Sequence, residues 1–274
     1  KIVATGRAEI EFTYDGGRTR LAHLDQSDPL RILFPDVADD EPVTGALVTT
    51  SGGLVGGDSL GIVVRGAAGT ASRIVGQAAE KVYRSLGADV TIEVKLDASD
   101  GAWLEWLPQE TILFENARMR RATLADVGAG ARMMAGEMIV YGRTAMGETM
   151  TQGLVRDSWE VRREGRLVWS DALHLDTELN ATLNSAAGLG GASAYASMIY
   201  VGDDAPDSID TARDLLGEPE QGLYAAATCV GDVLIVRWLG ANSLSLRNAY
   251  GDFWCGFRSR IAGYPAQMPR LWNM

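Results

Sequence analysis

The sequence predicts a mainly β protein with a β-helix-like or sandwich-like fold and two helices in the C-terminal third. Three observations lead to this prediction. Apolar and polar residues alternate along much of the first two thirds of the chain, glycine-containing turns separate the alternating segments, and two later segments carry helix signals, one in its capping residues and one in its helical spacing. No Pro- or Ser-rich linker divides the chain, so we expect residues 1–274 to form a single domain.

Period-two alternation is typical of strands that bury one face and expose the other. Segments of this kind occupy residues 9–14, 90–97, 159–162 and 167–175. Turn-forming triplets with glycine lie beside them, at residues 15–17, 99–101, 128–130 and 164–166. Short strands joined by such turns indicate a β-sandwich or a β-solenoid. We find no convincing sequence repeat at a fixed period, so both folds stay open.

The last third of the chain changes character. Residues 177–197 are rich in small residues and carry no periodic pattern. Ser208 is a candidate N-cap for a short helix that ends at Leu216. After this helix, residues 224–230 and 233–239 are typical of two strands joined as a hairpin.

The clearest helix begins at Asn242 or Ser243 and ends before Gly263 and Pro265. One of its stripes repeats at 3.6-residue spacing and is expected to pack into the core, because such a stripe marks the buried face of a helix. The stripe consists of Leu246, Tyr250, Phe253, Phe257 and Ile261.

The composition excludes some classes of function. The formal net charge is −11 and the pI is near 4.7, whereas a nucleic-acid-binding protein usually presents a basic face. An acidic protein attracts cations or a basic partner surface, and its charge also maintains solubility. Apolar runs such as 138–140 and 233–236 fall far short of the ~20 residues that span a bilayer, so no membrane segment is expected. Without a signal peptide, the expected location is the cytoplasm.

Motifs of common enzyme classes are missing from the sequence. Its two histidines, His23 and His174, lie in no H-E-x-x-H motif, and no G-x-S-x-G motif is present. Its two cysteines, Cys229 and Cys255, form no CxxC pair. The sequence therefore favours a non-enzymatic protein. An uncharacterised hydrolase that uses two carboxylates as acid and base is the alternative from a different class.

A glycine-rich segment at residues 52–57 precedes Asp58. A phosphate-binding loop needs Gly-Lys-Ser/Thr at the start of a helix, and a carboxylate at position 58 would repel phosphate. We expect the glycines to form a tight turn whose backbone angles only glycine adopts easily.

Residues 104–114 form an apolar block that Pro108 interrupts, which excludes a continuous central strand. Two short strands are expected to flank a corner that carries Gln109 and Glu110. A carboxylate among Trp and Leu side chains is costly to bury unless it is paired or bound to a cation. Glu110 therefore either pairs with an arginine or a backbone N–H, or lines a polar path for a cation.

Several sequence blocks follow one another in an order typical of one protein family. They are GGLVGGD at 52–58, QAAEKVYRS at 77–85, LEWLPQETILF at 104–114, GEM with the later GR and GE pairs at 136–148, LHL at 173–175 and PRLW at 269–272. Through these blocks, which span most of the chain, the sequence resembles the UreD (also called UreH) family of urease accessory proteins. It departs from the family pattern at Ser51, Glu80, Gly136 and Met274.

The resemblance implies a non-catalytic, β-helix-like protein that binds UreF and, through it, the GTPase UreG, and that docks on apo-urease. It also implies an internal polar tunnel for nickel, whose positions carry over to Asp58, Glu80, Glu137 and Asp171. Nickel(II) would pass transiently and no cofactor would be tightly bound, because carboxylates release nickel more readily than thiolate or imidazole cages do. The alternative within the family is a pure interaction scaffold whose carboxylates are structural.

Overall fold

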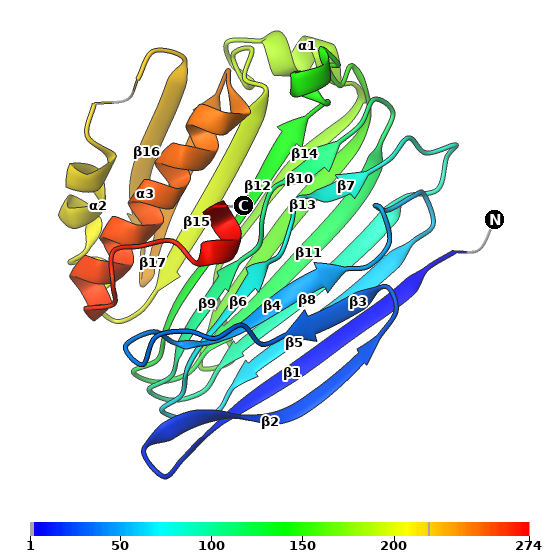
Figure 1. Cartoon of the computed structure of the whole chain (residues 1–274). Helices are drawn as coiled ribbons and strands as arrows, with labels where there is room; N and C mark the ends of the chain where they lie inside the picture. Colours follow the sequence, from blue (N-terminus) through cyan, green and yellow to red (C-terminus); the bar gives the residue numbers. More distant parts are fainter. Residues whose placement is uncertain (1–2, 219, 274) are drawn as a thin grey trace.

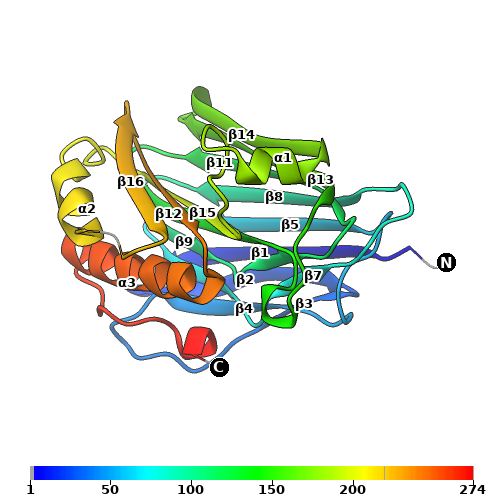
Figure 2. The ribbon, with the colours of Figure 1, turned by 90° about the horizontal axis from the view of Figure 1, so that it is seen from above.

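The computed structural model describes residues 3–218 and 220–273, and the chain winds into a β-solenoid of about four turns (Figure 1). Two large sheets face each other, and the longest helix lies on the outer side of one of them (Figure 2). The expected mainly β class is confirmed, and of the two expected architectures the β-helix-like one is observed.

The first sheet has seven strands, and its five central strands pair in parallel. Both edge strands pair antiparallel to their neighbours. From one edge to the other the strands are β14 (Arg166–Glu178), β13 (Gln152–Arg163), β11 (Arg118–Val127), β8 (Val90–Ala98), β5 (Ser59–Gly66), β1 (Thr5–Asp15) and β2 (Arg18–Ser27).

The second sheet has ten strands, and it is parallel in its centre and antiparallel at both ends. Its main path runs through β16 (Leu223–Val230), β17 (Val233–Gly240), β15 (Ala194–Val201), β12 (Arg132–Tyr141), β9 (Trp103–Leu107), β6 (Ala71–Gly76), β4 (Val43–Thr49) and β3 (Leu30–Leu33). Two short strands, β7 (Glu80–Val82) and β10 (Thr111–Leu113), pair beside this path. The break between β9 and β10 falls at Pro108, as expected.

The strand register shows why the sequence has no fixed repeat. Ser59 pairs with Thr91 on the next coil, Thr91 pairs with Arg120, and Arg120 pairs with Arg156. These residues are unequally spaced in the chain, so equivalent positions of successive coils do not recur at a constant interval. The repeat exists in space but not as a period in the sequence.

Inward-facing residues of the two sheets form the main core between them. On β8, Val90, Ile92, Val94 and Leu96 are buried, which confirms the face predicted from their alternation. Residues on the outer face of the second sheet form a separate apolar cluster with the C-terminal helix, and Trp238 on β17 belongs to it. The molecule therefore has one core inside the solenoid and another beneath the helix.

The C-terminal helix α3 (Ser243–Ala262) has the predicted caps. The Asn242 side chain accepts hydrogen bonds from the backbone N–H groups of Leu244 and Ser245, and Gly263 ends the helix with φ 74°. The expected core stripe is buried at Leu246, Tyr250, Phe253 and Phe257.

The second predicted helix, α2 (Ile209–Leu216), follows Ser208, whose hydroxyl donates to the Asp204 carbonyl instead of capping the helix. A third, short helix, α1 (Leu179–Asn184), lies in the segment to which the sequence assigned no structure. Single 3₁₀ turns occupy Thr144–Met146 and Arg270–Asn273. Among the described residues, no helix is long and apolar enough to cross a membrane.

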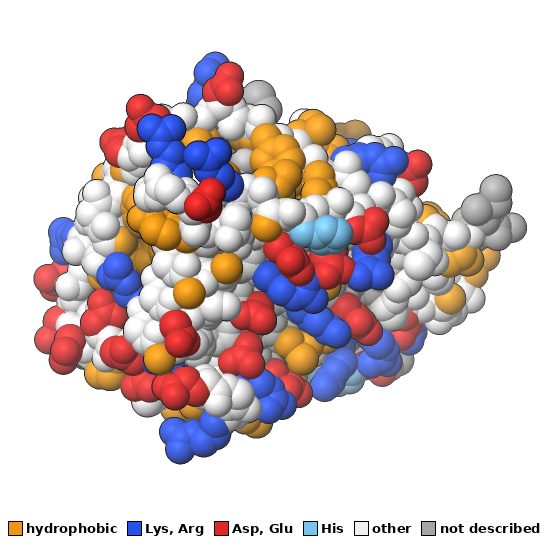
Figure 3. Space-filling model, turned by 90° about the horizontal axis from the view of Figure 1, so that it is seen from below, with side chains coloured by type: hydrophobic (Ala, Val, Ile, Leu, Met, Phe, Trp, Pro, Cys, Tyr) orange, Lys and Arg blue, Asp and Glu red, His pale blue; other side chains and the backbone are white. Residues whose placement is uncertain are grey.

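The outer surface mixes both signs of charge. On the outer face of the first sheet, Arg65 on β5 contacts the carboxylates of Glu9 and Glu11 on β1. Seen from below, acidic and basic side chains are interspersed over the visible surface (Figure 3). The net negative charge is therefore not gathered into one acidic face on this side of the molecule.

Candidate functional site

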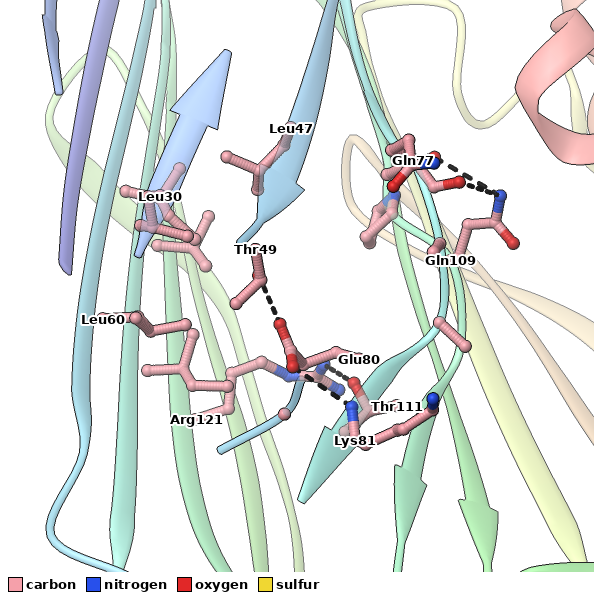
Figure 4. Close-up of a pocket in the computed structure, with 18 of the residues that line it drawn as sticks. Leu30, Leu47, Thr49, Leu60, Gln77, Glu80, Lys81, Gln109, Thr111 and Arg121 are labelled. Atoms are coloured by element: carbon pink, nitrogen blue, oxygen red, sulfur yellow. Dashed lines mark hydrogen bonds between the residues drawn. The ribbon is translucent and has the colours of Figure 1, made fainter. Parts of the chain in front are cut away.

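A cavity of about 200 Å³ lies between the two sheets, near the corners that join β6 to β7 and β9 to β10. Leu30, Leu47 and Leu60 line one side of it, and Glu80 and Gln109 lie across from them (Figure 4). The cavity therefore places the Glu80 carboxylate opposite an apolar wall in the interior of the solenoid, while the Gln109 amide points away from the leucines (Figure 4).

Glu80, at the start of β7, is held by two hydrogen bonds. Its Oε2 accepts one from Thr49 Oγ1 at 2.5 Å, and its Oε1 accepts one from the Lys81 N–H at 3.1 Å. Burial raises the pKa of Glu80, and both hydrogen bonds oppose this rise because they stabilise the charged form. The register places Glu80 opposite Thr111 on β10.

Glu137 on β12 lines the same cavity and belongs to a buried ion cluster. Arg121 on β11 donates from Nε and Nη2 to the two carboxylate oxygens of Asp157 on β13, at 2.9 and 2.8 Å. Its Nη1 lies 2.5 Å from Glu137 Oε2. The other oxygen of Glu137 accepts a hydrogen bond from Trp106 Nε1 at 2.9 Å. One guanidinium thus faces two buried carboxylates.

The cluster perturbs the protonation of its cavity-facing carboxyl group. Burial raises the pKa of Glu137 to about 7, against the attraction of Arg121, and the nearby charge of Asp157 adds to the rise. An arriving cation would therefore compete with a proton for this carboxyl group more than it would for an exposed glutamate.

The register also explains why these residues meet. Arg121 lies directly opposite Asp157 in the first sheet. Glu137 lies opposite Ser197 in the second sheet, and Ser197 lies opposite Arg237. Opposed residues of neighbouring strands point to the same side of a sheet. The polar side chains therefore form two rows, one on each inner face of the solenoid.

The row of the second sheet ends at an ion pair between the sheets. Arg237 Nη2 lies 2.5 Å from Asp171 Oδ2 on β14, and both side chains are partly exposed. Burial raises the pKa of Tyr195 and the pKa of Tyr141, and the nearby charge of Asp157 adds to both rises. A line of polar groups thus extends from the cavity towards Asp171, which does not itself line the cavity.

Asp58 lies elsewhere and does not line the cavity. It is buried, its Oδ1 accepts a hydrogen bond from the Ala4 N–H at 2.9 Å, and its Oδ2 accepts one from the Val55 N–H at 2.8 Å. The expected tight turn before it is confirmed by the positive φ of Gly53 (138°) and Gly57 (99°). The carboxylate of Asp58 thus ties this turn to the N-terminal end of the chain.

Three charged residues of this line of polar groups were not found from the sequence: Arg121, Asp157 and Arg237. Each occupies an inward position on its strand. Four consecutive residues at 118–121 read RMRR, so the strand pattern does not reveal which arginine faces the core. The available signal was a charged residue at a strand position whose neighbours two residues away are buried. Which positions of a strand face inward is known only once the strand pairing is known.

A second buried ion cluster lies on the outer side of the second sheet, beneath α3. Glu105 on β9 accepts hydrogen bonds from Arg258 Nε at 3.0 Å and Trp103 Nε1 at 2.8 Å. Arg258 and Arg73 each donate to Glu41 at 2.8 Å. Two arginines face two glutamates, so the charges balance and the cluster anchors α3 on the sheet.

The corner between β9 and β10 contacts the C-terminal segment. Gln109 donates to the Leu271 carbonyl at 2.8 Å and accepts from Arg247 Nη2 at 2.8 Å. Glu110 Oε2 lies 3.4 Å from Arg247 Nε. Of the two roles expected for Glu110, pairing with an arginine is confirmed.

The histidines and cysteines lie away from this line of polar groups. His23 and His174 are exposed, and Cys229 and Cys255 carry free thiols. Within residues 3–218 and 220–273, no group of three or more His, Cys, Asp or Glu side chains is placed to hold a metal ion. The carboxylates of the path occur singly or as the pair Glu137 and Asp157.

Comparison with known proteins identifies the family. The family described as UreD urease accessory protein matches residues 4–273. The urease accessory protein UreD of Magnetococcus marinus is 46% identical over 272 residues, which cover 98% of this chain and 94% of that protein. UreD 2 of Methylorubrum populi is 39% identical over 257 residues (94% and 84%), and UreD of Rhizobium etli is 34% identical over 271 residues (99% and 96%). The chain therefore belongs to the UreD family of urease accessory proteins, a non-catalytic family involved in urease maturation.

Proposed function

We propose that the chain conducts nickel(II) through the interior of its solenoid to apo-urease, in a complex with UreF and the GTPase UreG. Glu80 and Glu137 line one cavity, and there the guanidinium of Arg121 faces two buried carboxylates. Buried carboxylates favour a positive partner, and Glu80, which is held by a hydroxyl and a backbone N–H, offers its charge to a cation in this cavity.

The ligands along this path suit passage better than storage. Glu80, Glu137 and Asp171 offer carboxylate oxygens, whereas tight transition-metal sites use thiolate or imidazole ligands. We expect nickel to bind the isolated chain with a dissociation constant of about 1 μM or weaker, which corresponds to about −8 kcal/mol or a less favourable value. Calorimetry checks this, and nanomolar affinity would contradict it.

The path has two ends in this proposal. One is the cavity at Glu80, and the other is the partly exposed pair of Asp171 and Arg237. The sequence contains no P-loop, so nucleotide hydrolysis in such a complex falls to UreG.

The proposal is tested by removing charge at the cavity without changing side-chain shape. We expect Glu80→Gln and Glu137→Gln to lower the nickel content and activity of urease matured in their presence, while the yield of the accessory complex stays unchanged. Glu93→Gln is the matched control, because Glu93 is exposed on the outer face of β8. Normal urease nickel content in both cavity variants would refute the conduit.

A pure interaction scaffold remains the second candidate. It is favoured by Asp58, whose two oxygens are engaged by backbone N–H groups, and by Asp171, which is paired with Arg237. If urease nickel content changes only in proportion to complex yield, the scaffold alone explains the function. The hydrolase alternative is set aside because the family is non-catalytic.

A further inference from the structure

Arg121 separates the cavity from Asp157. Arg121 and Glu137 line the cavity, but Asp157 lies behind the guanidinium and does not. All three nitrogens of the guanidinium are engaged, by Asp157, Glu137 and the hydroxyl of Thr111, the last at 3.2 Å. A cation in the cavity thus meets Glu137 first and reaches Asp157 only if the guanidinium moves.

The guanidinium also occupies the position that a metal ion would need. An ion held by both Glu137 and Asp157 would lie between their oxygens, where Arg121 now lies. Two positive charges a few ångströms apart repel strongly inside a protein, where the effective dielectric constant is well below that of water. Arginine stays protonated at every relevant pH, so only its movement, and not its titration, vacates this position.

A second observation concerns a tyrosine on β12, the strand that carries Glu137. The Tyr141 hydroxyl is buried, has no hydrogen-bond partner among the described residues, and interacts electrostatically with both Asp157 and Arg121. Buried polar atoms are normally hydrogen-bonded, so this hydroxyl is available to bond a group that enters the cluster.

We propose that Arg121 is a counter-cation gate: its guanidinium keeps the Glu137 and Asp157 pair from trapping a divalent cation, and a cation passes beyond the cavity when the guanidinium is displaced. This inference rests on the proposed nickel conduit and adds to it the residue that controls passage. A purely structural Arg121 would also compete with a cation for the two carboxylates, so the fall in urease nickel content, measured beside nickel affinity, separates a gate from a structural residue.

The test is nickel binding by Arg121→Gln, measured by calorimetry on the purified chain. Without the guanidinium, Glu137 and Asp157 become available to the metal together, so we expect nickel to bind at least tenfold more tightly while urease nickel content falls. The matched control is Arg65→Gln, because Arg65 also faces two glutamates, Glu9 and Glu11, but on the outer surface. Nickel affinity of the control should equal that of the unmodified chain.

A folded Arg121→Gln variant whose nickel affinity is unchanged or weaker would overturn the gate. If this variant does not fold, Arg121→Lys decides, because lysine keeps one positive charge but cannot hold both carboxylates in the same way. A rise in nickel affinity of about threefold in Arg121→Lys supports the gate, and an unchanged or lower affinity overturns it. Glu80→Gln and Glu137→Gln, assayed in parallel, separate the two proposals: if they lower urease nickel content while the Arg121 variants bind nickel normally, only the gate fails.

Discussion

Asp171 on β14 and Arg237 on β17 join the two sheets through one ion pair, with 2.5 Å between Oδ2 and Nη2. The strand β14 is an edge of the first sheet, and β17 lies next to the edge strand of the second. The pair therefore stands where the two inner faces of the solenoid meet the solvent. Its side chains are 37% and 42% exposed, so solvent weakens their attraction.

For this reason we expect Asp171→Asn to lower the free energy of unfolding by less than about 1 kcal/mol. Complex assembly should stay intact, and urease nickel content should fall because the variant removes a charge at the end of the path. Complex yield and urease nickel content are measured together. Arg237→Gln is measured alongside, because it breaks the same ion pair by removing the charge of the arginine. Normal nickel content with Asp171→Asn would remove Asp171 from the path.

Asp58→Asn should act on stability and not on nickel transfer. The amide keeps one acceptor oxygen but turns an N–H donor towards the backbone donor of Ala4 or Val55. We expect a loss of about 1.5–3 kcal/mol in the free energy of unfolding, as for other hydrogen bonds to charged groups. Urea denaturation measures the loss. A lower nickel content per assembled complex would instead place Asp58 on the path.

Glu137 should make stability depend on pH in a defined window. Its folded-state pKa of about 7 lies above the ordinary value of 4.5, so the folded state holds the proton more tightly than the unfolded chain does. The resulting stabilisation is fully present below about pH 4.5 and is lost as the pH rises to about 7. Glu137→Gln removes this dependence.

Denaturation of both proteins at several pH values between 4.5 and 8 checks the prediction. The stability of the unmodified chain relative to Glu137→Gln should fall across the window and level off above it. A constant difference between the two proteins would show that Glu137 titrates normally. Glu80→Gln is measured alongside, because burial also raises the pKa of Glu80.

Glu105→Gln should be among the most destabilising single changes in the chain. Glu105 is fully buried, and its loss leaves Arg73 and Arg258 to share the carboxylate of Glu41. Breaking a buried ion pair from one side costs about 3–5 kcal/mol, because a charge is left without its partner. Near-ultraviolet circular dichroism should report a loosened α3.

The control for this change is Glu148→Gln, which breaks the surface pair of Glu148 and Arg143. An exposed pair contributes about 1 kcal/mol or less, so this variant should unfold close to the unmodified chain. Equal stability losses in the two variants would contradict the anchoring role of Glu105.

Local patterns in the sequence determined several of the elements, although not the short helix α1. Alternation placed the buried face of β8, and the spacing from Leu246 to Phe257 identified the buried face of α3. Asn242 and Gly263 marked both ends of that helix. These features depend on residues a few positions apart, so they can be predicted from the amino-acid sequence alone. The ordered sequence blocks also indicated the family, and the match over residues 4–273 confirms it.

Only the tertiary structure decided how the coils align, and therefore which polar residues meet. Arg121 and Asp157 are far apart in the chain and adjacent in space because β11 and β13 pair in one register. Gly136 shows the same dependence: a Cβ there would lie 2.1 Å from Tyr250 Oη on α3, a contact that no local pattern reveals. Long-range register follows from the packing of the whole core. The sequence could thus name the carboxylates and the turn before Asp58, but only the fold showed that Glu137 lines the cavity and that Asp58 does not.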